Sequence, residues 1–313
     1  MKILLVGRML PYNAEFFYRK AFNSLGHETC VLDSYQGVRY PFLSRTMASR
    51  VSLFRPLERH FPVNRKLPEY ADRYDPDAIL IFKGEFIDTA VLESLSENYP
   101  LYLLYPDNYR FNPLLKGRLH LFRKVFTAAN SVDGYYQLGA RSVVTVPWAC
   151  DPEFHRKLSI ERKYKFTFIG TGYIERRKIV RKLNGVEVFG NFWFGLGKAR
   201  HGPVFGDDYV KTINQSQISL NLQGNGAIYA DSPTMRTFEL AGSGGFQISD
   251  YMSSVKRYFP EIVTFRDVNE LRELMEYYGD AAEEGEIIAE KLMERTVKSF
   301  KYVDSANLIL DNI

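Results

Sequence analysis

The stretch "KFTFIGTGYIERRKIVRKL", residues 165–183, decides how the second half of this chain is interpreted. An apolar run ends at Gly170, and a helical pattern begins after Gly172. Three basic residues follow in succession: Arg176, Arg177 and Lys178. Glycine lets a backbone approach a ligand closely, and the start of a helix attracts phosphate. Because Glu175 stands where a dinucleotide motif has its last glycine, the stretch also fits a plain strand–turn–helix unit with a solvated basic face.

The same alternation of strand and helix runs through both halves of the chain. In the first half, apolar runs predict strands at 2–6, 28–32, 77–82, 101–105, 125–129 and 143–146. In the second half, they predict strands at 165–170, 186–190, 217–222, 245–249 and 261–265. Helical patterns between these runs indicate parallel sheets covered by helices. The stretch 147–165, with Pro147 and Pro152, interrupts the alternation and is interpreted as a linker.

This order predicts an α/β protein of the GT-B type, with two doubly wound, Rossmann-like domains facing a central cleft and helices at the C-terminus. The expected domains are an acceptor-side domain at 1–148 and a donor-side domain at 149–295. A last helix at 296–313 is expected to cross back to the first domain. Ligands of such folds lie outside the carboxyl ends of the strands, so candidate residues are sought directly after strands.

Composition excludes several functional classes. The 313 residues carry 41 basic and 37 acidic side chains, a net charge of +4 that is too small to indicate nucleic-acid binding. Two cysteines and five scattered histidines predict neither disulfides nor a metal site, and we expect no metal or cofactor. Asp207 and Asp208 fit a helix cap better than a metal-binding pair. The apolar start reads as a strand rather than a signal peptide, which predicts a cytoplasmic protein.

A second candidate site is "DSPTMRTFELAGSGGF", residues 231–246. Arg236 and Glu239 are three residues apart and share a helix face. Glu239 could accept hydrogen bonds from a ribose diol, Arg236 could meet a diphosphate, and Asp231 could reach a sugar. The alternative is structural. Asp231 or Ser232 would then cap the helix, and Arg236 and Glu239 would form an ion pair.

Three further segments carry candidate residues. The polar loop at 220–232, with Asn221 and Asn225, suits ligand contact or a plain connection. Polar residues after strands of the first half are candidates for an acceptor site or are turn residues: Gly7, Arg8, Lys83, Glu85 and Asp107. Segment 39–66 holds seven basic residues among apolar ones, which fits an anionic surface or a solvated insertion.

In order, the motifs of residues 147–300 resemble the CgeB-like glycosyltransferases, which are related to group 1 glycosyltransferases. The resemblance rests on "FTFIGTGYIERRKIVRKL", "VEVFGNFWF", "ISLNLQGNG", "TMRTFELAGSGGFQISD" and "VTFRDVNELRELMEYY". In group 1 enzymes, two acids eight residues apart contact the donor, the first near the sugar and the second at the ribose. Asp231 and Glu239 have this spacing, and Asp231 stands where a Glu is usual.

The resemblance implies transfer of a sugar from a nucleotide-diphosphate sugar to a glycan, protein or lipid-linked acceptor. Arg176 and Arg236 would stabilise the leaving group, with Asp231 as a third catalytic residue. The remaining donor contacts would be Gly170, Thr171, Gly172, Arg177, Asn221, Asn225, Thr237 and Glu239. A sugar-nucleotide epimerase and a non-catalytic two-lobed binding protein remain alternatives, and the sequence leaves retention or inversion open.

Overall fold

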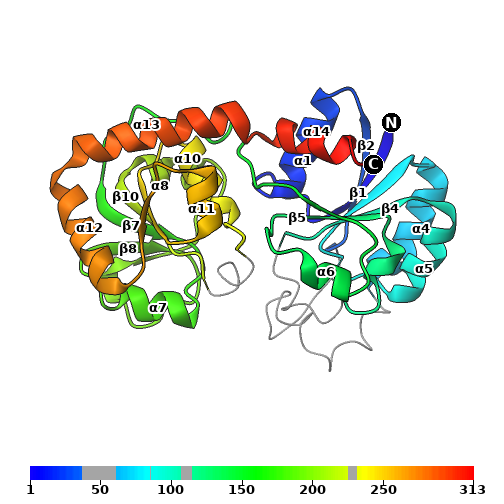
Figure 1. Ribbon diagram of the computed structural model, residues 1–313, viewed down its shortest axis with the longest axis horizontal. Helices are drawn as coiled ribbons and strands as arrows, with labels where there is room; N and C mark the ends of the chain where they lie inside the picture. The colour runs from blue at the N-terminus through cyan, green and yellow to red at the C-terminus, as the bar shows by residue number, and fades with distance from the viewer. Residues whose placement is uncertain (37–60, 85, 107–114, 225–230) are drawn as a thin grey trace. The chain divides into compact units, whose positions relative to one another are not determined.

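The computed structural model describes residues 1–36, 61–84, 86–106, 115–224 and 231–313. The chain divides into two compact units (Figure 1). The first unit comprises Met1–Pro147 together with Val303–Ile313, and the second comprises Trp148–Tyr302. Each unit is built around one parallel sheet of six strands.

The first sheet has the strand order β2-β1-β3-β4-β5-β6. Its strands are β1 (Lys2–Gly7), β2 (Glu28–Asp33), β3 (Ala78–Phe82), β4 (Leu101–Leu104), β5 (Lys124–Thr127) and β6 (Val143–Thr145). The helices of this unit are α1 (Ala14–Ser24), α4 (Pro62–Tyr74), α5 (Thr89–Asn98), α6 (Asp133–Gln137) and most of α14 (Tyr302–Leu310). Strands β3 and β4 are apolar and buried along their whole length, as strands covered by helices on both faces must be.

The second sheet has the strand order β12-β11-β10-β7-β8-β9. Its strands are β7 (Tyr164–Ile169), β8 (Val186–Phe189), β9 (Arg200–His201), β10 (Ser216–Asn221), β11 (Gln247–Asp250) and β12 (Val263–Phe265). Its helices are α7 (Ile174–Val180), α8 (Asp207–Asn214), α10 (Met235–Gly242), α11 (Ser253–Tyr258), α12 (Val268–Asp280) and α13 (Ala282–Ser299). Read from β9, this is the strand order of the dinucleotide-binding fold.

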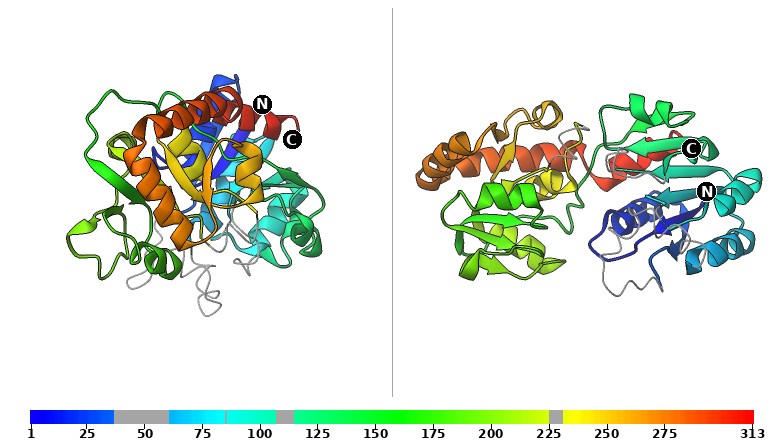
Figure 2. Two further views of the ribbon diagram at one scale, coloured as in Figure 1. Left: turned by 60° about the vertical axis from the view of Figure 1, so that its left-hand side comes forward. Right: turned by 90° about the horizontal axis from the view of Figure 1, so that it is seen from below.

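Two apolar layers cover the faces of the second sheet, because successive residues of a strand point to opposite sides. Phe168 and Val188 pack with α7, α12 and Trp193 on one face. Ile169 and Phe189 pack with α8 and α10 on the other. Two further views show helices on both sides of the strands (Figure 2). The sheet therefore separates the apolar side chains of α7, such as Val180, from those of α10, such as Leu240.

Each sheet has one point at which the chain reverses the direction in which it adds strands. In the first sheet this point lies between β1 and β3, and in the second it lies between β7 and β10. Strands β7 and β10 are parallel, with Thr167 opposite Ser219. Gly170 and Leu222 therefore leave the sheet side by side, at the edge where ligands of this architecture bind.

Several sequence-based expectations need correction. The expected linker packs within the second unit, where Ala149, Cys150 and His155 are buried. Neither Asp207 nor Asp208 caps α8, since Gly206 occupies the N-cap position and both acids lie in the first turn. Asp267 caps α12, because its carboxylate accepts hydrogen bonds from the amides of Asn269 and Glu270.

The turn after β7 is tightly packed against the loop after β8. The indole Nε1 of Trp193 donates to the carbonyl oxygen of Gly170 at 2.8 Å. Gly190 has a φ of 148°, and a Cβ there would overlap that same carbonyl. At Gly172, a Cβ would lie 2.7 Å from the Trp193 ring. These two glycines are thus required by packing between loops.

We expect Gly190→Ala to lower the free energy of unfolding of the second unit by about 3 kcal/mol, because it combines a disfavoured φ with a backbone overlap. Urea denaturation would measure this loss. Gly202→Ala is the matched control, since a Cβ at Gly202 has no atom within 4 Å and no positive φ to strain it. Equal stability of the two variants would contradict the packing argument.

Candidate functional site

Arg176 joins the two loops that leave the second sheet at its reversal point. Its Nε donates to the carbonyl of Leu222 and its Nη2 to that of Gln223, both at 3.0 Å. Its Nη1 donates to the carbonyl of Thr171 at 3.2 Å. A buried guanidinium can do this because its donors form a rigid planar fork. We call turn 170–172, loop 222–224, Arg176 and Arg236 the switch-point site.

Arg236 lies in the first turn of α10 and reaches the same place from the other side of the site. Its guanidinium carbon is 5.1 Å from the centre of the Phe168 ring, and that of Arg176 is 5.3 Å from it. The Nη2 atom of Arg236 occupies the space that a side chain at Gly170 would need. Its Nη1 is buried and has no hydrogen-bond partner among the residues described.

The two guanidiniums leave an excess of positive charge at this site. Burial, and then the charge of Arg236, lower the pKa of Arg176 to about 9. Two acids, Asp250 and Glu175, act on the charge of Arg176, and Asp250 accepts a hydrogen bond from the amide of Gln223 at 2.6 Å. Burial raises the pKa of Asp250 against the effects of that hydrogen bond and of Arg176. An unpaired buried donor beside a second cation is the arrangement that an anionic ligand completes.

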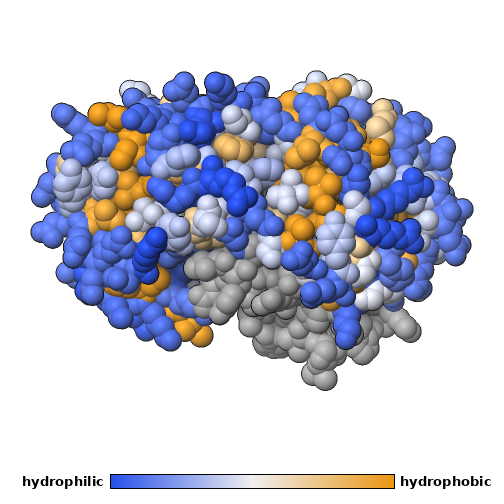
Figure 3. Space-filling model, in the orientation of Figure 1, coloured by the Kyte–Doolittle hydropathy of each residue, from blue (hydrophilic) through white to orange (hydrophobic). Residues whose placement is uncertain are grey.

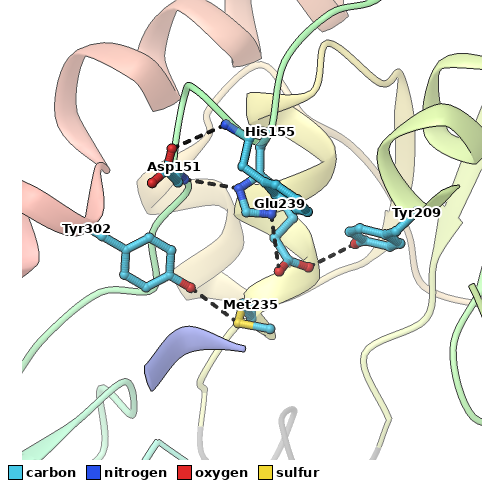
Figure 4. Close-up of polar contacts among 7 residues, drawn as sticks. Asp151, His155, Tyr209, Met235, Glu239 and Tyr302 are labelled. Carbon is cyan, nitrogen blue, oxygen red and sulfur yellow. Dashed lines mark hydrogen bonds and ion pairs between the residues drawn. The ribbon is translucent and has the colours of Figure 1, made fainter. Parts of the chain in front are cut away.

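Glu239 lies one turn further along α10, in a cluster with Tyr209 and His155 (Figure 4). The Tyr209 hydroxyl donates to its Oε2 at 2.8 Å, and His155 Nε2 lies 3.5 Å from its Oε1. The Nδ1 of His155 accepts from the amide of Asp151, so the ring carries its proton on Nε2, facing Glu239. Burial and the Glu239 charge raise the pKa of Tyr209 well above its usual value.

The purely structural interpretation of residues 231–246 is wrong in both of its parts. Arg236 and Glu239 form no ion pair, because the carboxylate bonds to Tyr209 and His155 instead. The N-cap of α10 is Thr234, which makes no side-chain cap hydrogen bond, rather than Asp231 or Ser232. The backbone amide of Thr234 instead donates a hydrogen bond to the side-chain oxygen of Gln223, eleven residues earlier in the sequence, at 2.8 Å.

Asp231 serves another helix. Its backbone is left-handed, with a φ of 45°, and its carboxylate accepts from the Ser254 amide at 3.0 Å and the Ser253 hydroxyl at 2.8 Å. Both serines open α11, so Asp231 caps that helix from outside. Burial tends to raise the pKa of Asp231, but these hydrogen bonds outweigh burial and lower it.

Asn221 and Thr237 lie behind the switch-point site. Both are completely buried, and the Asn221 side-chain amide donates to the Thr237 hydroxyl at 2.9 Å and to Gln247 at 2.8 Å. The Asn221 amide nitrogen and the Thr237 hydroxyl are therefore used within the chain and support the ends of β10 and α10, whereas the buried Oδ1 of Asn221 has no hydrogen-bond partner among the residues described. Arg177 points elsewhere, with its Nη1 donating to the carbonyl of Phe192 and its guanidinium over the Phe194 ring.

Three candidate residues of the first unit, Gly7, Arg8 and Lys83, lie at or directly after the ends of the neighbouring strands β1 and β3, at the reversal point of the first sheet. Gly7 ends β1 and Lys83 follows β3 with a φ of 61°, while the Arg8 guanidinium lies over the Tyr35 ring. Glu15 was not predicted from the sequence. Its side chain lies against Gly7, and burial raises its pKa against its hydrogen bonds to backbone amides and the charges of Lys83 and Arg8.

Some predicted residues lie outside the part of the chain that the structure describes: Asn225, Glu85, Asp107 and residues 39–60 of the basic segment. Within the described part, no three His, Cys, Asp or Glu side chains come together as ligands for a metal ion. No described helix has the length and apolar character needed to cross a membrane.

Comparison with known proteins places these features in a family. The glycosyl transferase-like family matches residues 155–311, which is half of the chain and includes the whole switch-point site. No curated protein matches the chain by sequence.

Solved structures with the same fold include glycosyltransferases of the GT-B type and a putative UDP-N-acetylglucosamine 2-epimerase from Listeria monocytogenes, the latter with a TM-score of 0.55 at 11% identity, covering 99% of this chain and 94% of that one. Sucrose-phosphate synthase from Thermosynechococcus elongatus superimposes with a TM-score of 0.69 at 11% identity, covering 100% of this chain and 98% of that one. HepE from Anabaena, in complex with UDP-glucose, gives 0.67 at 12% identity, covering 100% and 99%. The spinosyn rhamnosyltransferase SpnG, complexed with thymidine diphosphate, gives 0.50 at 14% identity, covering 100% of both chains. The two six-stranded parallel sheets therefore form a GT-B fold.

The capping role of Asp231 gives a pH-dependent prediction. Asn tolerates the left-handed backbone as Asp does, so Asp231→Asn tests the carboxylate alone. Because the folded pKa is depressed, the carboxylate stabilises the fold above its unfolded pKa, and this contribution disappears as pH falls through the folded pKa. We expect a loss of about 1 kcal/mol near pH 7 that shrinks toward zero in acid.

Urea unfolding at several pH values would measure this difference. Asp280→Asn, which breaks an exposed ion pair with Lys165, is the control and should change stability little. A loss that stays constant down to low pH would show that the carboxylate charge plays no part.

Proposed function

Because this chain belongs to the glycosyl transferase-like family, we propose that it transfers a sugar from a nucleotide-diphosphate sugar to an acceptor hydroxyl. The second unit would hold the donor at the switch-point site. One observation carries this proposal: Arg236 presents a buried, unpaired Nη1 beside Arg176, at the reversal point of the sheet. A diphosphate supplies the negative charge and the acceptor oxygens that these donors lack.

The chemistry of the transfer explains why charge is needed there. The bond between the anomeric carbon and the diphosphate oxygen breaks, and its electron pair stays on the diphosphate. The acceptor oxygen bonds to the anomeric carbon and loses its proton. Guanidiniums already in place stabilise the departing charge in the transition state, which is where electrostatic catalysis gains most. Arg236 takes this role, and Arg176 holds the surrounding loops while adding its own charge. We propose that no metal ion is required for it.

Glu239 is the proposed ribose contact. Tyr209 and His155 each take one acceptor position on its two oxygens, which leaves further lone pairs for a diol. The two donors also fix the carboxylate orientation before a ligand arrives, so little ordering is required on binding. Asp231 retains a proposed place near the sugar, although its carboxylate already binds α11.

The acceptor would bind the first unit, near Gly7, Arg8 and Lys83. Glu15 adds a carboxyl group that could bind a hydroxyl there. We further propose a cytoplasmic enzyme of the CgeB-like branch whose acceptor is a glycan, a protein or a lipid-linked sugar.

An epimerase would need acid and base groups around the sugar, and a binding protein would show no turnover. Incubation with UDP-, GDP- and TDP-sugars, followed by assay for free nucleotide and for epimerised sugar, separates these three activities.

Arg236→Ala is expected to weaken binding of the nucleoside diphosphate by about 30-fold, because one charged hydrogen-bonding group contributes about 2 kcal/mol. Isothermal titration in EDTA with UDP, GDP and TDP would measure the change and test metal independence together. Arg162→Ala, which removes an exposed guanidinium paired with Glu286, should bind as the wild type does. Unchanged affinity in Arg236→Ala would remove the basis for the diphosphate site.

Glu239→Gln is expected to weaken binding of the ribonucleotide about tenfold while leaving the 2′,3′-dideoxy nucleotide unaffected. The comparison isolates the contact with the diol, because the dideoxy ligand cannot make it. Glu290→Gln removes an exposed carboxylate paired with Lys157 and serves as the control. An equal loss for both nucleotides would mean that Glu239 acts only on the fold.

A further inference from the structure

The second unit carries an exposed cluster of apolar side chains beside α7. Tyr173, Ile174, Phe192 and Phe194 are each between 52% and 59% exposed. In the space-filling view, hydrophobic side chains reach the surface at the end of this unit where Figure 1 places α7 (Figure 3). We call these four residues, with Arg177, Lys178, Arg181 and Lys182, the aromatic–basic patch.

Contacts join Phe192, Phe194, Arg177 and Arg181 at the centre of the patch. The rings of Phe192 and Phe194 lie 6.3 Å apart, and the Arg177 guanidinium lies over Phe194 at 5.4 Å. Arg177 Nη1 and Arg181 Nη2 donate to the carbonyls of Phe192 and Phe194, respectively. The amide of Gly172, next to Tyr173, donates to the carbonyl of Asn191 at 2.9 Å, which joins the two loops. The rings are therefore held in place from beneath.

The chain accepts backbone strain to expose these rings. Phe192 has a φ of 64°, a left-handed conformation that a bulky side chain strongly disfavours. Its neighbour Trp193 is completely buried and bonds to the turn after β7. The side chains of Phe192 and Phe194 thus point outward, whereas that of Trp193 between them points inward and is held by its hydrogen bond to Gly170. Strain of this kind persists where the surrounding structure enforces it, and it gathers at sites of function.

The charge around the rings favours an anionic surface as the occupant. The patch carries four basic side chains, and the one acid between residues 175 and 182 is Glu175, while Arg176 in the same stretch is buried. Exposed aromatic and apolar side chains flanked by Lys and Arg are the combination that binds the interface of an anionic membrane. A second copy of this chain is a poor partner, because a two-fold interface would bring the same cationic surfaces together.

The patch adjoins the switch-point site at Tyr173, whose ring centre lies 5.4 Å from the Arg176 guanidinium carbon, and it lies away from Glu239. Glu239 and Tyr209 lie on the α8 and α10 side of the second sheet, whereas Val180 of α7 packs on the opposite face with Trp193. Figure 1 draws β7 and β8 between α7 and α10. We propose that the aromatic–basic patch docks the second unit on an anionic lipid surface, with Phe192 and Phe194 inserted among the headgroups.

Vesicle binding tests this proposal with the full chain. Wild-type protein is expected to sediment with phosphatidylcholine vesicles that contain phosphatidylglycerol and much less with pure phosphatidylcholine. Phe192→Gly with Phe194→Ala should reduce partitioning about tenfold or more. Glycine also relieves the positive φ at 192, so loss of binding cannot be attributed to a strained or unfolded loop. Thermal unfolding of the variant is expected to stay at or above that of the wild type.

Two further variants separate charge from insertion. Lys178→Gln with Lys182→Gln should weaken binding about tenfold on phosphatidylglycerol vesicles and leave the weak binding to phosphatidylcholine unchanged. Tyr277→Ala removes an equally exposed aromatic ring from α12 and should bind as the wild type does. It controls for a general loss of apolar surface.

Three outcomes overturn the proposal. The first is absence of wild-type binding to phosphatidylglycerol vesicles at low salt. The second is binding that the Phe192 and Phe194 substitutions leave unchanged, which would assign it to another segment such as 39–66. The third is a variant with Phe192→Gly and Phe194→Ala that binds vesicles as the wild type does but binds a glycan or a protein partner more weakly than the wild type. Nucleotide affinity, measured in parallel, reports on the donor site independently.

Discussion

The three hydrogen bonds from Arg176 to backbone carbonyls hold the second unit together at its reversal point. They join the turn after β7 to the loop after β10, which the sheet alone leaves as two separate ends. The same turn receives the Trp193 indole, and this contact sets the course of residues 190–195. The proposed donor site and the aromatic–basic patch therefore both depend on where Arg176 fixes that turn. The positive charges of Arg176 and Arg236 also repel each other, and a bound anion would offset this repulsion.

The sequence predicted all described strands except the two-residue strand β9, because buried parallel strands are nearly continuous apolar runs, as β3 and β4 show, whereas β9 consists of Arg200 and His201. The switch-point site was predicted in part for a similar reason. Residues after strands must meet at one edge of a sheet, and this rule places Gly170 and Arg176 near the end of β10. No sequence rule predicts that Arg176 donates three hydrogen bonds to backbone carbonyls. Two of its partners, Leu222 and Gln223, lie more than forty residues away in the sequence.

The partners of Glu239 show where sequence reasoning stops. His155 lies in a stretch interpreted as a linker, and Tyr209 comes from another helix, so neither has a spacing signal that points to Glu239. Asp231 shows the opposite problem. Its spacing of eight residues from Glu239 is informative in the sequence, yet its left-handed backbone turns its carboxylate toward α11. Spacing predicts which residues share a segment, and tertiary contacts decide where each side chain points.

Unusual features concentrate at one edge of the second sheet. An unpaired buried Nη1 on Arg236, a like-charged neighbour and a left-handed Phe192 each lower the stability of the isolated chain. A sequence selected only to fold would replace Arg236 with an apolar residue and Phe192 with glycine. Their presence is explained when each disfavoured group has an external partner, an anion for the guanidiniums and an interface for the rings. The turn fixed by Arg176 would position the residues that contact both partners.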